Sequence, residues 1–80
     1  MKILLVMKLS NGNLATGSKD KTINIWNIKV DDGQTLTLRG HTDAVTCLAE
    51  SQSKLLFSGS HDKTIKVWEI FSASILKTLG

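Results

Sequence analysis

The chain has 80 residues, of which 41% are hydrophobic and 21% charged, and its formal net charge is +3 at pH 7. This length allows one small domain at most, and the composition is that of a globular protein rather than a disordered one. One cysteine, Cys47, excludes an intrachain disulfide, and one cysteine with two histidines does not make a structural zinc set. We therefore expect no metal and no other cofactor.

Taken in chain order, the predicted elements are eight short strands in two sets of four. The first set comprises residues 2–8, 13–18, 22–27 and 35–39, and the second comprises residues 44–50, 54–60, 64–70 and 74–79. The third strand alternates Ile23 and Ile25 on one face with Asn24 and Trp26 on the other. Such a period of two, with β-branched residues, is typical of a strand.

The connections between these strands carry turn residues. Asn11 and Gly12 predict a two-residue hairpin turn, because both residues accept positive φ. Residues 31–33 and 51–53 are predicted loops. A helix over residues 45–56 is the rival interpretation, but the polar residues 50–54 interrupt its apolar face, so strands are favoured.

The two sets of strands are copies of one repeat with a spacing of 42 residues. TGSKDKTINIWNI at residues 16–28 aligns with SGSHDKTIKVWEI at residues 58–70. The alignment pairs Gly17 with Gly59, Asp20 with Asp62, Thr16 with Ser58, Trp26 with Trp68, Leu5 with Cys47 and Ile3 with Val45. A repeat of this length indicates a fold built from stacked supersecondary units.

These residues resemble the WD-repeat β-propeller family, and the resemblance covers nearly the whole chain. It rests on the Gly40-His41 pair, on two copies of GS-x-DKTI-x-[IV]-W and on a Trp followed by Asn or Glu in place of Asp. The implied fold is all-β: two four-stranded antiparallel blades of an incomplete propeller. The implied boundaries are residues 1–39 for a first repeat without its Gly-His and residues 40–80 for the second.

The resemblance also implies a structural set of hydrogen bonds in the second repeat. The Trp68 indole would donate to the Ser58 hydroxyl, Ser58 would bond His41, and His41 would donate its other ring N–H to Asp62. Buried polar groups need such partners, because an unsatisfied one costs about 1–3 kcal/mol. The first repeat supplies the corresponding Thr16, Asp20 and Trp26 but no histidine.

Two sets of residues in this sequence have a chemical alternative to the structural interpretation. Ser58, His41 and Asp62 are the residue types of a hydrolytic triad, but Trp68 binds the serine, so no free nucleophile is expected. Cys47 lies in an apolar strand and is predicted to be a small buried hydrophobe. We therefore expect no catalytic residue and no enzyme.

Two blades alone leave two apolar sheet faces uncovered, because at least three repeats are normally needed for stability. Three interpretations follow: a piece of a longer propeller, a chain that assembles with copies of itself, or a chain that docks onto blades of another protein. The first is favoured. The missing first Gly-His counts against self-assembly, because one unit in each copy would lack its histidine.

The function expected is that of a protein-binding scaffold or adaptor, in the cytoplasm or the nucleus. The longest apolar run, residues 3–7, is too short for a membrane span, so no membrane partner is expected. The alternative is a basic loop rim that binds phosphopeptides or nucleic acid, although the basic residues form no run. The candidate contact residues are Lys19, Lys21, Arg39, Asp43, His61 and Lys63.

Overall fold

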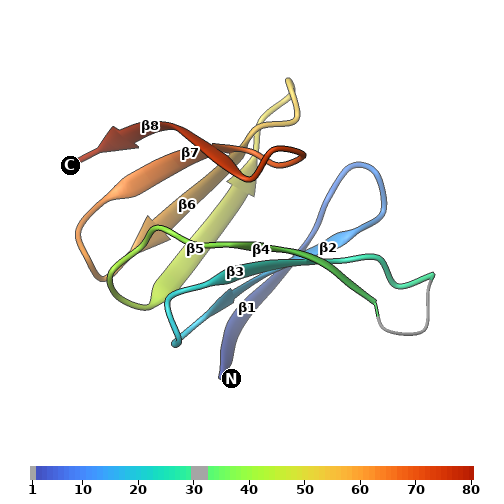
Figure 1. Cartoon of the computed structure of the whole chain (residues 1–80), viewed down its shortest axis with the longest axis horizontal. Helices are drawn as coiled ribbons and strands as arrows, with labels where there is room; N and C mark the ends of the chain where they lie inside the picture. Colours follow the sequence, from blue (N-terminus) through green and yellow to red (C-terminus); the bar gives the residue numbers. More distant parts are fainter. Residues whose placement is uncertain (1, 30–32) are drawn as a thin grey trace.

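The computed structural model, which describes residues 2–29 and 33–80, contains eight strands in two antiparallel sheets (Figure 1). The strand order is β1-β2-β3-β4 in the first sheet and β5-β6-β7-β8 in the second. The strand bounds are β1 Ile3–Lys8, β2 Leu14–Ser18, β3 Ile23–Trp26, β4 Gln34–Leu38, β5 Val45–Glu50, β6 Leu56–Ser60, β7 Ile65–Glu69 and β8 Ser74–Leu79.

The all-β fold and all eight strands predicted from the sequence are confirmed, with ends that differ by at most two residues. No helix occurs in the described ranges, so the rival helix over residues 45–56 is excluded. The predicted loop at Asp31 and Asp32 lies outside the described residues. Each sheet is a simple meander, because every strand pairs with its neighbours in sequence.

The predicted two-residue turn at Asn11 and Gly12 is wrong. The Gly12 amide donates to the Leu9 carbonyl at 2.9 Å and the Leu9 amide donates to the Asn13 carbonyl at 2.7 Å, so the loop has three residues. Gly12 alone in this loop has positive φ, at 92°. This is a type I turn closed by a left-handed residue, the second common hairpin connection.

The same loop geometry recurs at four other hairpins with side chains in the left-handed position. Lys21, Lys54, Lys63 and Ala73 have φ between 55° and 80°. At each of these positions the backbone amide donates to the carbonyl three residues earlier. The alternating sequence pattern of two neighbouring strands predicts that a turn joins them. The type of turn depends on the length of the loop, which is three residues here.

The two sheets pack face to face, with β5 against β1 and β2. Ile23, Ile25 and Leu38 of the first sheet and Leu56 and Trp68 of the second are at most 2% exposed and form one core. The sheets are in close contact where Gly17 of β2 meets Val45 of β5. A Cβ atom added at Gly17 would lie 2.6 Å from Leu5 Cδ2 of the same sheet, 3.0 Å from Val45 Cγ1 and 3.1 Å from the Val45 carbonyl oxygen.

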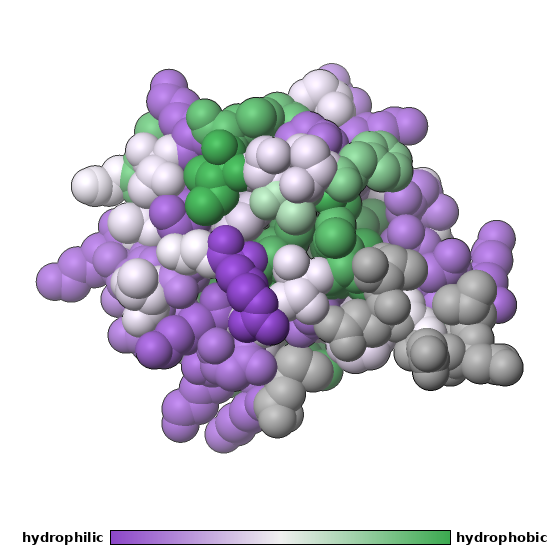
Figure 2. Space-filling view, in the orientation of Figure 1, coloured by the Kyte–Doolittle hydropathy of each residue, from purple (hydrophilic) through white to green (hydrophobic). Residues whose placement is uncertain are grey.

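Each sheet therefore has one covered face and one outward face. Trp68 is fully buried between the sheets, whereas its repeat counterpart Trp26 is only half-buried on the outward face of the first sheet. Cys47 is exposed, which corrects the prediction that it is buried. It lies on the outward face of the second sheet, and the apolar strand pattern alone did not reveal that this face is uncovered. Figure 2 shows apolar side chains gathered over the second sheet and the opening between the sheets, with hydrophilic ones below.

Candidate functional site

A buried chain of hydrogen bonds links the four residues singled out in the second repeat. Trp68 Nε1 on β7 donates to Ser58 Oγ on β6 at 2.7 Å. His41 Nε2, in the connection between β4 and β5, lies 2.7 Å from the same oxygen. His41 Nδ1 lies 2.8 Å from Asp62 Oδ2 in the β6–β7 loop. These hydrogen bonds thus link β6 and β7 to the β4–β5 connection and to the β6–β7 loop.

The chemistry of the partners determines where the protons lie in this network. An ionised carboxylate only accepts hydrogen bonds, so His41 carries its proton on Nδ1. The indole only donates, so Ser58 accepts from Trp68 and shares one hydrogen bond with His41 Nε2. Each ring nitrogen of His41 therefore has a hydrogen-bond partner. All four residues of this hydrogen-bond network therefore have partners for their polar atoms.

Asp62 is held ionised by several donors. Burial raises its pKa, but the Thr64 hydroxyl, the His41 ring and the backbone amides of Thr42 and Thr64 outweigh burial, so the pKa of Asp62 lies well below its ordinary value. The two amides donate at 3.0 Å and 2.8 Å. The carboxylate therefore organises its own loop as well as the histidine.

The first repeat satisfies its polar groups without a histidine. Trp26 Nε1 donates to Thr16 Oγ1 at 2.9 Å, and Thr16 Oγ1 donates to the Asn24 carbonyl at 3.4 Å. Asp20 accepts from the amide and the hydroxyl of Thr22, and the hydroxyl bond is the main reason that its pKa is lowered. Within the described residues, no buried side-chain nitrogen or oxygen atom lacks a partner.

The serine, histidine and aspartate are inaccessible to a substrate in this arrangement. Ser58 is 1% exposed and His41 is 6% exposed. The Ser58 oxygen also accepts from the Trp68 indole, which a nucleophile ready for attack on a carbonyl would not do. The Ser58, His41 and Asp62 side chains therefore form a structural hydrogen-bond network and not a catalytic triad. In the described ranges, no cluster of three or more His, Cys, Asp or Glu side chains could hold a metal ion.

The six candidate contact residues lie together at one end of the two sheets, in the β2–β3 loop, the β4–β5 connection and the β6–β7 loop (Figure 1). All six are exposed: Lys19, Lys21, Arg39, Asp43, His61 and Lys63. The His61 amide donates to the Ala44 carbonyl at 3.0 Å, which joins two of these segments. The described part of the chain shows no ion pair at any of these side chains.

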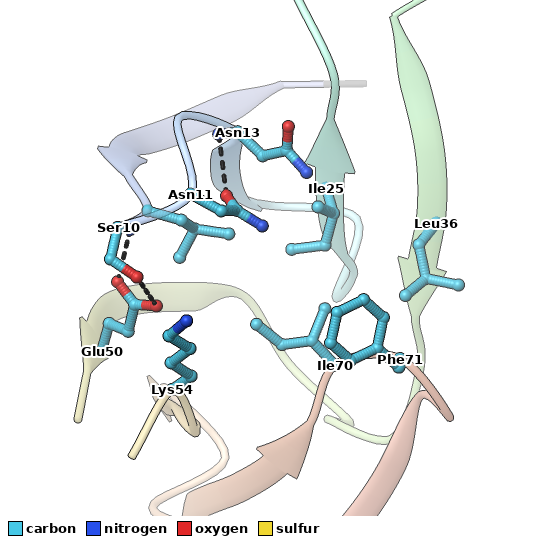
Figure 3. A pocket seen from close by; sticks show the side chains of 10 residues that line it. Ser10, Asn11, Asn13, Ile25, Leu36, Glu50, Lys54, Ile70 and Phe71 are labelled. Carbon is cyan, nitrogen blue, oxygen red and sulfur yellow. Dashed lines mark hydrogen bonds between the residues drawn. The ribbon is translucent and has the colours of Figure 1, made fainter. Parts of the chain in front are cut away.

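A groove at the opposite end of the sheets was not predicted from the sequence. It is a cavity of about 420 Å³ between the two sheets, beside the β1–β2, β5–β6 and β7–β8 loops (Figure 3). Its apolar lining comes from Leu9, Ile25, Leu36, Ile70 and Phe71. Phe71 is 90% exposed, so its ring stands at the edge of the groove in water.

Polar groups mark the other side of the groove. Glu50 accepts from the Ser10 amide at 2.8 Å and from the Ser10 hydroxyl at 3.0 Å, which fixes the β1–β2 loop against β5. Lys54 extends into the cavity from the β5–β6 loop (Figure 3), and no ion pair of its ammonium occurs within residues 2–29 and 33–80. The groove thus combines an apolar lining, the exposed ring of Phe71 and the ammonium group of Lys54.

Phe71 is the one feature of the sequence that could have indicated this groove. The repeat alignment places the apolar Phe71 where the first repeat has the charged Lys29, in a predicted loop. A large apolar residue in a loop is unusual unless it is covered or serves as a contact. The depth of the groove could not be predicted, because it depends on the spacing of two sheets.

No helix in the described part of the chain is long and apolar enough to cross a membrane. Among curated proteins, none matches the chain. The sequence model of the family described as "WD domain, G-beta repeat" matches residues 7–27 and 33–69.

Two solved structures are similar to the chain over 96% of its length. The "Crystal structure of RRP9 WD40 repeats" superposes with a TM-score of 0.84 and the "Structure of U3-55K" with a TM-score of 0.83, each at 35% sequence identity. In both cases the chain spans only 24% of the length of the chain that it matches. The similarity thus covers nearly all of this chain and a minor part of each relative.

Proposed function

The chain belongs to the WD40 repeat family, and from this premise we propose that it is a non-catalytic protein-interaction module of a larger β-propeller. WD40 repeat domains are generally protein-interaction scaffolds and generally lack catalytic activity. Residues 1–39 and 40–80 would each contribute one blade. The single cysteine is a free thiol, which suits the reducing conditions of the cytoplasm or nucleus.

The groove between the sheets is the observation that carries this proposal. An exposed aromatic ring beside an apolar hollow is the usual form of an interaction hot spot, because a partner side chain buries both at once. Phe71 is 90% exposed, and Ile70 and Leu36 line the hollow next to it. The Glu50–Ser10 hydrogen bonds fix one side of the groove before a partner arrives, which lowers the entropic cost of binding.

The groove also indicates the chemistry of the partner. The available Lys54 ammonium favours a carboxylate near the buried side chain of the ligand. The ligand that fits is therefore an extended peptide segment with one large apolar residue followed or preceded by an acidic residue.

A peptide-display selection against the purified chain tests this proposal. We expect selected peptides with an apolar anchor and an acidic neighbour to bind Phe71→Ala at least about tenfold more weakly than wild type, the cost of a modest hot spot. Lys54→Glu is expected to weaken binding of the same peptides, whereas Lys19→Glu, at the opposite end of the sheets, is the matched control. Selected peptides that bind Phe71→Ala as tightly as wild type would refute the groove.

A basic loop rim is the second candidate surface, favoured by the exposure of Lys19, Lys21, Arg39 and Lys63 without ion pairs in the described ranges. Such a rim would bind a phosphopeptide or a nucleic acid mainly through charge. Affinity for a single-stranded oligonucleotide or a phosphorylated peptide would then fall steeply with salt, whereas groove binding would change little. A flat salt dependence would exclude the rim as the main contact surface.

A further inference from the structure

Two asparagine side chains lie on the β1–β2 side of the groove. Asn11 and Asn13 both line the cavity, and Figure 3 shows them across it from Ile70 and Phe71. Asn13 comes directly before β2, so by the alternation of the strand it lies on the same face as Ala15, between the sheets. Ala15 is fully buried, whereas Asn13 is half-buried at the end of that face. A carboxamide thus stands beside the apolar lining of the groove.

The second repeat shows that the hairpin itself does not need a carboxamide at position 13. The 42-residue spacing places Asn13 over Leu55, which comes directly before β6 as Asn13 comes before β2. The Ser51 amide donates to the Leu55 carbonyl at 2.8 Å, and the Leu9 amide donates to the Asn13 carbonyl at 2.7 Å. A half-buried amide costs free energy unless it forms hydrogen bonds, and leucine avoids that cost. The pairing of the strands therefore does not account for the asparagine.

The backbone of this loop is already paired, but the two carboxamides keep polar groups for a ligand. The Asn13 amide donates to Asn11 Oδ1 at 2.9 Å. This bond fixes the orientation of the Asn11 carboxamide and leaves its Nδ2 hydrogens available. Within residues 2–29 and 33–80, neither Asn11 Nδ2 nor the Asn13 side chain forms a hydrogen bond. One wall of the groove therefore offers donors and an acceptor next to an apolar hollow.

These groups match the main chain of an extended peptide. A carboxamide has the same kinds of donor and acceptor as a peptide bond, so it can bond both the N–H and the C=O of a ligand. In a helix these groups are bonded within the helix, whereas an extended segment presents them to its surroundings. Side chains of an extended segment also alternate, so one enters the hollow while the main chain stays at the wall.

We propose that Asn13, positioned beside Asn11, binds the main chain of an extended peptide whose apolar side chain fills the groove. This inference rests on the proposed function, because it assumes that the groove binds a peptide. It assigns separate roles to the residues of the site. Phe71 and Lys54 contact side chains of the ligand, whereas Asn13 selects its conformation.

Calorimetric titration of the full chain with the tightest peptide from the display selection tests this proposal. We expect Asn13→Ala to bind the peptide about three- to tenfold more weakly than wild type, the effect of one neutral hydrogen bond. Gln52→Ala is the matched control and should bind like wild type, because this exposed carboxamide does not line the groove. Asn13→Leu, which copies the second repeat, is the second variant. Tryptophan fluorescence during urea unfolding checks that each variant is folded.

Ester analogues of the same peptide separate main-chain recognition from a general effect on the groove. Each analogue replaces one amide by an ester, which removes an N–H donor and keeps every side chain. At one position we expect the ester to weaken binding to wild type about three- to tenfold and to leave binding to Asn13→Ala unchanged. Esters that weaken binding to both proteins equally at every position would overturn the proposal, as would an Asn13→Ala variant that binds the peptide as tightly as wild type.

Failure of this inference and failure of the proposed function give different results. Weak binding to Phe71→Ala, together with unchanged binding to Asn13→Ala and Asn13→Leu, would refute the main-chain contact and leave the groove as the binding site. A selection that yields no peptide dependent on Phe71 would refute both.

Discussion

Asp62 shows how one side chain organises its surroundings at the scale of a residue. Its carboxylate accepts from His41, from the amides of Thr42 and Thr64 and from the Thr64 hydroxyl. Asp20, its counterpart, accepts from the amide and hydroxyl of Thr22 and has no histidine beside it in the described residues. The difference follows from the histidine, which the second repeat has and the first lacks.

Asp62→Ala is expected to lower the free energy of unfolding by about 1–3 kcal/mol, because His41 and the loop amides lose their acceptor. Asp20→Ala is expected to cost less, since fewer donors are left without a partner. Urea denaturation followed by tryptophan fluorescence measures both. Equal losses at the two positions would contradict a special role for the histidine network.

Acid is expected to weaken the same network. The folded-state pKa of Asp62 lies below its ordinary value of 3.8, so its stabilisation is complete above that value and is lost as the pH falls toward the folded-state pKa. The difference in unfolding free energy between wild type and Asp62→Asn should therefore shrink between about pH 5 and about pH 2. A difference that stays constant over this range would show that the carboxylate charge does not matter.

The hairpin is the recurrent unit at the scale of an element. Five loops use a three-residue turn that ends in a left-handed residue, and glycine occupies that position only in the β1–β2 loop, at Gly12. The four other loops accept lysine or alanine there at a conformational cost. The strand pairing on both sides holds these residues in place.

Gly12→Ala isolates that cost. An added Cβ atom at Gly12 meets nothing within 4 Å, so the change introduces strain without a collision. The left-handed conformation costs an alanine roughly 1 kcal/mol, and we expect about that loss in unfolding free energy. The urea midpoint of Gly12→Ala, compared with the conservative Gly12→Asn, measures it. An alanine variant as stable as wild type would mean that the loop changes to another turn.

The contact between the two sheets is decisive at the scale of the whole molecule. In Gly17→Ala the added Cβ atom would crowd Leu5 of the same sheet and Val45 of the other, so we expect a cost of about 1–3 kcal/mol, the usual penalty of overpacking. Gly59→Ala, whose added Cβ atom would make only ordinary contacts with Cys47, is the matched control and should change the unfolding free energy by less than about 0.5 kcal/mol. Chemical denaturation of both variants at a concentration where the chain is monomeric decides the matter. Similar losses would mean that the strand, and not the packing, needs the glycine.

The repeat, the eight strands and the members of the polar network are legible in the sequence, because each leaves a local pattern. Period-two alternation indicates strands, and buried Trp, Ser, His and Asp side chains must find partners of fixed chemistry. Which of two equivalent residues in the two repeats is buried between the sheets depends on the tertiary structure alone. Trp26 and Ile65 have the same local patterns as their buried counterparts Trp68 and Ile23, yet they lie on outward faces, and so does Cys47. Burial depends on whether another sheet covers a face: the groove at Phe71 lies between the two sheets, whereas Gly59 lies on a face of the second sheet that no described strand covers.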